Sequence, residues 1–323
     1  MNTKDSTPRL HLDERILDDA RRFNRKLALA PRFKVTNQWT PRLGQALLRL
    51  FQLGADRKLR RAGLSVQRLV ASSGGVHVPV RVLRPAGAPQ GVVLDIHGGG
   101  WVIGNPEMND RLNADIIRAC GVTVVSVDYR LAPHATVGEM IEQCTAAARW
   151  LLQGALPDCA HLPVIVIGES AGAHLAAATL QRLRAWPALL EPIAGAVLYY
   201  GVYDLAGTDS VRAAGPDTLV LDGPTMLPAL RMLTPGLDNA ARRDPMLSPL
   251  YGDLAGMPPA LRARLDAELT ADGWPHAATI GETRRRARRA DAPNPSRALD
   301  ELDPVAVRIA HEADARPARA HLV

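Results

Sequence analysis

The stretch VIVIGESAGAHLA, residues 164–176, decides how this chain is expected to fold. Residues 164–167 are apolar and β-branched without alternation, which is the pattern of a strand buried on both faces of a parallel sheet. A stretch rich in alanine and leucine at 171–184 predicts a helix directly after it. The turn between them reads Gly168-Glu169-Ser170-Ala171-Gly172, and a Gly-x-Ser-x-Gly turn in that context predicts a nucleophilic Ser170 whose hydroxyl projects above the sheet. A strand-to-helix turn without chemistry is the alternative interpretation.

A second glycine-rich stretch, HGGGW at 97–101, follows another apolar run at 92–96. Consecutive glycines let the backbone approach a ligand closely and aim successive N–H groups at it. The run matches neither the Gly-x-x-x-x-Gly-Lys-Ser/Thr nor the Gly-x-Gly-x-x-Gly pattern, so a nucleotide cofactor is disfavoured. Paired with the Ser170 turn about 70 residues later, it predicts the other half of an oxyanion hole.

Outward from these motifs, strand patterns alternate with helix patterns. Alternation of strands and helices predicts an α/β fold with a mostly parallel, doubly wound sheet. The amino-terminal residues 1–65 look helical and amphipathic, with four apolar side chains at helical spacing: Leu47, Leu48, Leu50 and Phe51. The segment 201–259 is too long for a plain loop and is expected to contain helices. The expected strands are 76–82, 92–96, 122–127, 164–167 and 194–200, and the expected helices are 111–119, 139–152 and 171–184.

Six short motifs together resemble the hormone-sensitive-lipase-type (family IV) esterases of the α/β-hydrolase fold. They occur in the family's order and spacing and cover about residues 70–261: HGGGW at 97–101, SVDYRLAP at 126–133, GESAGAHLA at 168–176, YYGVYDL at 199–205, SPL at 248–250 and MPPAL at 257–261. The resemblance implies a helical cap segment at 1–65 and an α/β-hydrolase core at 66–261, with a cap insertion at about 204–250. It also implies carboxylic-ester hydrolysis of small-molecule esters through an acyl-enzyme, without a metal or organic cofactor.

The same resemblance assigns roles to individual residues. Ser170 would be the nucleophile, and the N–H groups of Gly99, Gly100 and Ala171 would form the oxyanion hole. His97 and Gly98 would orient the glycine loop, and the segment that contains Asp128 would buttress it. Two further polar residues near Ser170 are expected to stay outside the catalytic triad: Glu169, in an elbow position where the family accepts an acid, and His174, which is expected to pack.

The resemblance ends at Leu261, before the acid and the histidine that a nucleophilic serine needs. The remaining residues, 262–323, contain 11 Arg, 15 Ala and no Lys, and they show no apolar strand and no turn of the expected type. The last sheet strands are therefore expected to be missing. The weak candidates for the triad acid are Glu268 and Asp272, and His276, His311 and His321 are the histidines available.

This atypical tail suggests that residues 262–323 are translated out of frame, because a frame change in a GC-rich gene would produce Arg and Ala in excess. An impaired or inactive hydrolase, or a binding protein that keeps the oxyanion pocket, is then the alternative to an active esterase. Recruitment of Glu268 and His311 by an unusual terminal fold is a further alternative. Amide hydrolysis at the same site cannot be separated from ester hydrolysis by sequence.

Composition excludes several other classes of protein. No run reaches the roughly 18 apolar residues that a membrane span needs, and the charged amino terminus has no signal-peptide core. Three cysteines without Cys-x-x-Cys spacing argue against a disulfide framework or a zinc site, so a cytoplasmic protein is expected. The net charge is +6, but aromatic residues make up only 4% of the chain. Without a stacking platform or a recognised motif, nucleic-acid binding is not expected. Oligomeric state is left open.

Overall fold

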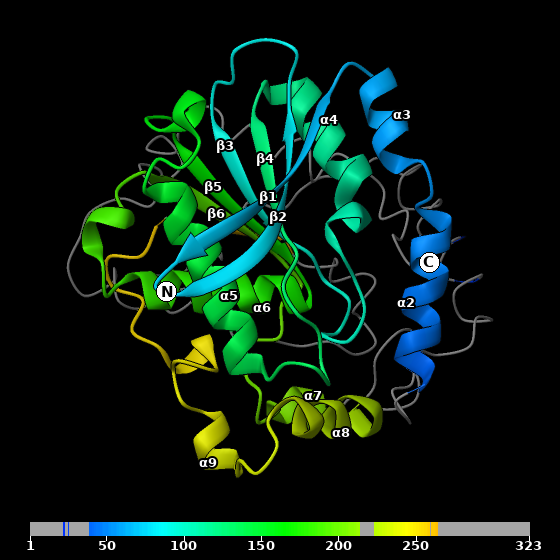
Figure 1. Ribbon diagram of the computed structural model, residues 1–323. Coiled ribbons are helices and arrows are strands. Elements are labelled where there is room, and N and C mark those ends of the chain that lie inside the picture. The colour runs from blue at the N-terminus through cyan, green and yellow to red at the C-terminus, as the bar shows by residue number, and fades with distance from the viewer. Residues whose placement is uncertain (1–21, 23–24, 26–38, 214–222, 259, 264–323) are drawn as a thin grey trace, which may run out of the picture.

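A computed structural model describes residues 39–213, 223–258 and 260–263, together with the isolated residues 22 and 25. Its centre is a seven-stranded sheet with the order β1-β2-β4-β3-β5-β6-β7, visible in Figure 1 as a twisted layer between helices. The β1–β2 and β2–β4 pairs are antiparallel, and the other pairs are parallel. The strands are β1 Ser65–Ser73, β2 Val76–Arg84, β3 Val92–Ile96, β4 Thr123–Val127, β5 Val164–Glu169, β6 Ile193–Tyr199 and β7 Ala260–Ala263.

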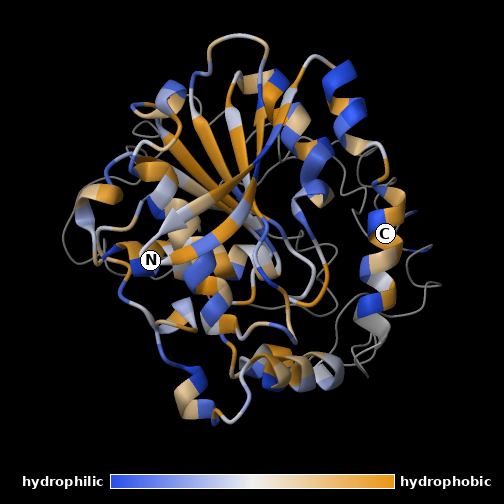
Figure 2. Ribbon diagram, viewed as in Figure 1, coloured by the Kyte–Doolittle hydropathy of each residue, from blue (hydrophilic) through white to orange (hydrophobic). Residues whose placement is uncertain are grey.

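The parallel core forms because its strands are apolar on both faces. Every residue of β3 and β4 is buried, including the polar Asp95 and Ser126, as β-branched runs without alternation predict. Alternate residues of β3 join two separate hydrophobic clusters, with Leu94 in one and Val93 in the other. The strands accordingly appear mostly orange in Figure 2.

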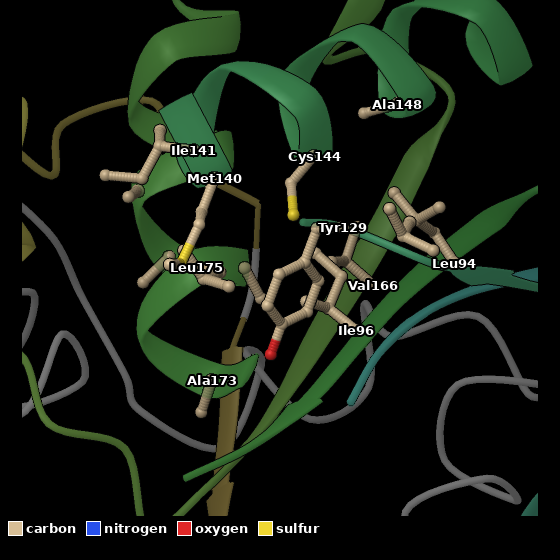
Figure 3. Close-up of a cluster of buried hydrophobic side chains, with 14 of the residues drawn as sticks. Leu94, Ile96, Tyr129, Met140, Ile141, Cys144, Ala148, Val166, Ala173 and Leu175 are labelled. Atoms are coloured by element: carbon tan, nitrogen blue, oxygen red, sulfur yellow. The ribbon is translucent and has the colours of Figure 1, made fainter. Parts of the chain in front are cut away.

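Helices cover both faces of this sheet, which makes it doubly wound. Helices α5 and α6 pack on one face, where Figure 3 shows Met140, Cys144 and Leu175 gathered around Tyr129 and Ile96. Helices α3 and α4 pack on the other face. The predicted α/β fold class with a mostly parallel, doubly wound sheet is confirmed. The helices are α2 Trp39–Phe51, α3 Ala55–Arg61, α4 Asp110–Cys120, α5 Val137–Leu152, α6 Ala171–Leu183, α7 Asp209–Ala213, α8 Gly223–Leu233 and α9 Asn239–Arg242.

Strand β7 departs from the sequence-based expectation about the end of the sheet. We expected no strand after Leu261, yet β7 continues to Ala263 and pairs in parallel with β6 through Ala196↔Ala260 and Tyr199↔Ala263. Backbone hydrogen bonds with β6 form this strand without the long apolar run that the prediction required. Whether further strands follow lies outside the described residues.

Helix α2 also differs from the sequence-based expectation, because most of its apolar side chains do not face the core. Leu48 is buried, but Leu47 is 47% exposed, Leu50 59% and Phe51 66%. Gly44 and Gln45 of the helix, and Gln52 directly after it, instead face the segment that follows the HGGGW stretch. Among the helices of the described residues, none is long and apolar enough to cross a membrane.

Candidate active site

The Ser170 turn joins β5 to α6 at a strained backbone position. Ser170 has φ 50° and ψ −117° and is the residue that precedes the first turn of α6. A positive φ at a residue other than glycine costs on the order of 1–3 kcal/mol and persists only where the surroundings enforce it. Here the Ser170 N–H donates to the Tyr199 carbonyl (2.8 Å), and the Ser170 carbonyl accepts from the His174 N–H (3.2 Å).

The two glycines of the turn are required by close approach of backbone to backbone. A Cβ on Gly168 would overlap the carbonyl of Gly172. A Cβ on Gly172 would overlap the carbonyl of Ile96 and lie 2.5 Å from the carbonyl oxygen of His97. The helix that begins at Ala171 therefore sits directly against the end of β3, which only glycine permits.

The HGGGW loop leaves β3 beside this turn, because Ile96 pairs with Gly168 in the parallel β3–β5 ladder. Gly99 (φ 105°), Gly100 (φ 59°) and Trp101 (φ 63°) all have positive φ. The loop closes through the Gly99 carbonyl, which accepts from the N–H groups of Val102 (3.2 Å) and Ile103 (3.1 Å). A Cβ on Gly99 would overlap the Ile103 carbonyl, so a glycine is required there.

The backbone donors that we assigned to an oxyanion hole are unused within the described residues. The N–H groups of Gly99 and Gly100 donate to no other described residue, and neither does that of Ala171. Ala171 is the first residue of α6, where backbone N–H groups lack partners inside the helix. Unpaired donors at a helix amino terminus favour an anionic ligand.

His97 supports the glycine loop from inside the protein. Its ring is stacked on Tyr129, with ring centroids 4.3 Å apart and an interplanar angle of 13°. The Tyr129 hydroxyl donates to the His97 carbonyl (2.8 Å), and the His97 Nδ1 lies 2.8 Å from the Gly98 carbonyl oxygen. Burial lowers the pKa of His97 to about 4, so the ring is neutral at pH 7. These contacts agree with an orienting part for His97.

His174, one turn after Ser170, has both ring nitrogens occupied. The Trp101 Nε1–H donates to its Nδ1 (3.3 Å), which assigns the ring proton to Nε2, and that group donates to the Leu247 carbonyl (2.7 Å). Burial lowers the pKa of His174 to about 4. A ring held in this way packs and cannot take the proton of Ser170.

Within the described residues, the two acids next to the motifs make no contact with a histidine that would suggest a triad. The Glu169 carboxylate accepts from the Tyr200 hydroxyl (3.0 Å), and burial raises the pKa of Glu169. Burial likewise raises the pKa of Asp128, which follows β4 and donates its backbone N–H to the Pro79 carbonyl (3.0 Å). Glu268, Asp272, His276, His311 and His321 lie outside the described residues. Within the described part of the chain, no histidine side chain is hydrogen-bonded to the Ser170 hydroxyl.

A buried carboxylate that the sequence analysis did not single out anchors the start of the glycine loop. Asp95 on β3 is fully buried and accepts from Asn109 (2.8 Å), Asn113 (2.8 Å) and Ser126 (2.6 Å). Burial raises the pKa of Asp95, while its three donors act in the opposite direction. A polar residue inside the apolar run 92–96 was the available signal. In the described residues, no group of three or more His, Cys, Asp or Glu side chains is placed to hold a metal ion.

The family comparison agrees with the geometry of strand, turn and helix. Residues 93–281 match the model of the alpha/beta hydrolase fold family. This match covers more than half of the chain and includes both glycine-rich motifs, so the chain belongs to the alpha/beta hydrolase fold family. The matched region extends 20 residues beyond Leu261, where the motif resemblance ends.

Several relatives of this chain carry the names of esterases or hydrolases. An acetyl-hydrolase of Streptomyces hygroscopicus is 31% identical over 57% of this chain and 60% of its own length. An acetyl esterase of Salmonella schwarzengrund is 32% identical over 43% of each chain. The chain thus spans roughly half the length of these curated relatives.

Solved structures of esterases also superpose on this chain. A hyperthermophilic esterase from the archaeon Pyrobaculum calidifontis superposes with a TM-score of 0.61 at 27% identity, covering 78% of this chain and 79% of the other. An esterase from Mycobacterium marinum superposes with a TM-score of 0.63 at 27% identity, covering 74% and 75%.

Proposed function

We propose that this protein is a serine carboxylic-ester hydrolase of the hormone-sensitive-lipase type, acting on small esters of short acyl groups. The observation that supports this most directly is the strained Ser170 between two sterically required glycines, next to a loop whose N–H groups are unpaired within the described residues. The names of the relatives, acetyl esterase and acetyl-hydrolase, support a short acyl group.

The proposed reaction proceeds through an acyl-enzyme. The Ser170 Oγ attacks the ester carbonyl carbon and loses its proton to a base, and the carbonyl oxygen becomes an anion. The N–H groups of Gly99, Gly100 and Ala171 donate to that anion, and each such donor is worth roughly 10²–10³-fold in rate. The ester C–O bond then breaks, the alcohol leaves with the proton, and water hydrolyses the acyl group from Ser170. Among the described residues no histidine is hydrogen-bonded to the Ser170 hydroxyl, so this reaction requires a base and an acid partner that these residues do not supply.

A second candidate function, non-catalytic binding of a small acid or ester at the same oxyanion hole, is favoured by one observation. Among the described histidines, His97 and His174 lie nearest in sequence to the motifs, and both are neutral, buried and held by other partners. An oxyanion hole without a base would still bind an anion but would turn over slowly.

Hydrolysis of p-nitrophenyl acetate and p-nitrophenyl butyrate by the full chain distinguishes the two. We expect Ser170→Ala to lower kcat by at least about 10³-fold, because the nucleophile is lost. The matched control is Ser65→Ala, an exposed serine at the start of β1, which should stay within twofold of wild type. Turnover that survives in Ser170→Ala would contradict the proposal. Wild-type turnover no faster than that of Ser170→Ala would favour the binding protein.

A further inference from the structure

Gln45 of helix α2 and Gln52, the residue directly after this helix, hold the backbone that closes the HGGGW loop. The Gln45 Nε2–H donates to the Gly104 carbonyl (3.0 Å), and the Gly104 N–H donates back to the Gln45 Oε1 (2.8 Å). One side-chain amide therefore satisfies both backbone groups of a single residue. A pair of antiparallel hydrogen bonds of this kind fixes direction as well as distance.

A second amide pair continues the same contact one residue further along the loop. The Gln52 Nε2–H donates to the Asn105 Oδ1 (2.9 Å), and the Asn105 Nδ2–H donates to the Gln52 Oε1 (2.6 Å). Gly44, the residue before Gln45, faces Ile103, whose Cγ2 would lie 3.7 Å from a Cβ on that glycine. The side of α2 that meets the loop is thus built largely from small and amide-bearing residues.

Gly104 connects this contact to the oxyanion donors. Its φ is 131°, and a Cβ there would lie 2.5 Å from the His97 Nδ1, so the backbone at 104 packs directly on the ring of His97. One residue earlier, the Ile103 N–H donates to the Gly99 carbonyl (3.1 Å). A displacement of Gly104 would therefore reach both the residue that precedes the glycines and the peptide that contains the Gly100 N–H.

We propose that Gln45 is a positioning residue for the oxyanion hole, and that Gln52 assists it by holding Asn105. The helix fixes the backbone of residues 103–105, and this keeps the N–H groups of Gly99 and Gly100 aimed at the carbonyl oxygen above Ser170. This inference rests on the proposed function. A helix that served only to cover the core would be expected to turn its apolar side inward, yet Leu47 and Leu50 are about half exposed while Gln45 and Gln52 face the protein.

Three variants in the full chain test this role. Gln45→Met keeps the length of the side chain but removes both hydrogen bonds. Gln45→Glu keeps the acceptor for the Gly104 N–H and, when ionised, loses the donor to the Gly104 carbonyl. Gln153→Ala is the matched control, an exposed glutamine at the end of α5 with no part in the loop. The readouts are kcat, KM and their pH dependence with p-nitrophenyl acetate, together with the midpoint of thermal unfolding.

We expect Gln45→Met to lower kcat about tenfold with KM within twofold, because misplaced donors weaken transition-state stabilisation rather than substrate binding. Gln45→Glu should lose less at neutral pH, and its kcat relative to wild type should rise as the pH is lowered and the introduced carboxyl gains a proton that it can donate. Gln153→Ala should match wild type. A kcat within twofold of wild type in both Gln45 variants, with or without a lower unfolding midpoint, would overturn the positioning role.

Failure of the proposed function would be recognised separately, as wild-type turnover that does not depend on Ser170. In that case amide hydrogen exchange of residues 99–104 decides whether the contact holds the loop. We expect exchange at least tenfold faster in Gln45→Met and unchanged exchange in Gln153→Ala. Equal exchange rates in the wild type, Gln45→Met and Gln153→Ala would refute the inference.

Discussion

Removing the hydroxyl of Tyr129 tests whether the segment after β4 supports the glycine loop. Burial raises the pKa of Tyr129 well above its ordinary value, so the hydroxyl keeps its proton and donates to the His97 carbonyl (2.8 Å). Tyr129→Phe leaves that buried carbonyl without its donor, which costs about 1–3 kcal/mol. For a domain of this size each kcal/mol shifts the unfolding midpoint by roughly 2–4 °C.

A second variant separates the hydrogen bond from the stacked ring. Tyr129→Leu also removes the ring that lies 4.3 Å from that of His97, and we expect a total loss of about 3–5 kcal/mol. The free energy of unfolding is measured by guanidinium denaturation. The slope of this free energy against denaturant concentration should be the same in the wild type, Tyr129→Phe and Tyr129→Leu. Turnover of Tyr129→Phe should fall several-fold if His97 orients the loop. A Phe variant within about 0.5 kcal/mol of wild type would refute the buttress, since that is the lower end for a single hydrogen bond.

Three further predictions concern the surroundings of the site. Gly172→Ala should lower the free energy of unfolding by at least about 3 kcal/mol in thermal unfolding, because its Cβ would overlap backbone atoms. The control Gly236→Ala, at φ 76° in open surroundings, should lower it by only about 1 kcal/mol. Equal losses in the two variants would contradict the packing argument. The folded-state pKa of His174, about 4, lies below its ordinary 6.5, so the unfolded chain binds the extra proton and the free energy of unfolding falls as pH drops from about 6.5 toward 4. His174→Gln should flatten that fall in urea titrations at pH 7 and pH 5, and an unchanged slope would count against it. Arg81→Met, which leaves the acids that surround the buried guanidinium without their cation, should cost about 3–5 kcal/mol by guanidinium denaturation, whereas a stability within 1 kcal/mol of wild type would show that the network is dispensable.

The strands of the parallel core could be predicted because burial on both faces largely determines their sequence. A strand covered by helices on both faces must be apolar throughout, and 92–96 and 164–167 satisfy this almost without exception. Strand β1 was missed because, among the described strands, it lies at the edge of the sheet and pairs only with β2. Its burial alternates weakly, and Val70 is 57% exposed, so the apolar pattern that identifies a strand is largely absent.

The candidate site could be located from the sequence where it depends on the backbone, and not where it depends on side chains distant in sequence. Gly168 and Gly172 are visible in the sequence because close backbone approach admits no other residue. Gln45 and Gln52 could not be found in this way, because a polar residue on an amphipathic helix has the same appearance whether it faces solvent or a loop 50 residues away. The role of Asp95 was not recognised because an apolar run surrounds it and because its three hydrogen-bond donors come from later segments of the chain.

Two separate stretches of strained backbone, at Ser170 and in the HGGGW loop, lie side by side, which favours a functional site over a plain connection. Glycine adopts a positive φ without strain, so a plain turn between strand and helix would place a glycine at such a position. Here Ser170 has φ 50°, although glycines occur two residues before and after it. Strain of this kind, on the order of 1–3 kcal/mol, leads from an observed outlier to a hypothesis of function. The adjacent strand ends in a loop with three consecutive residues at positive φ, of which Trp101 is not glycine. Because Ile96 and Gly168 are paired in the ladder, both features lie at the same edge and level of the sheet. Packing requires neither, whereas a serine that attacks a carbonyl between convergent N–H donors requires both.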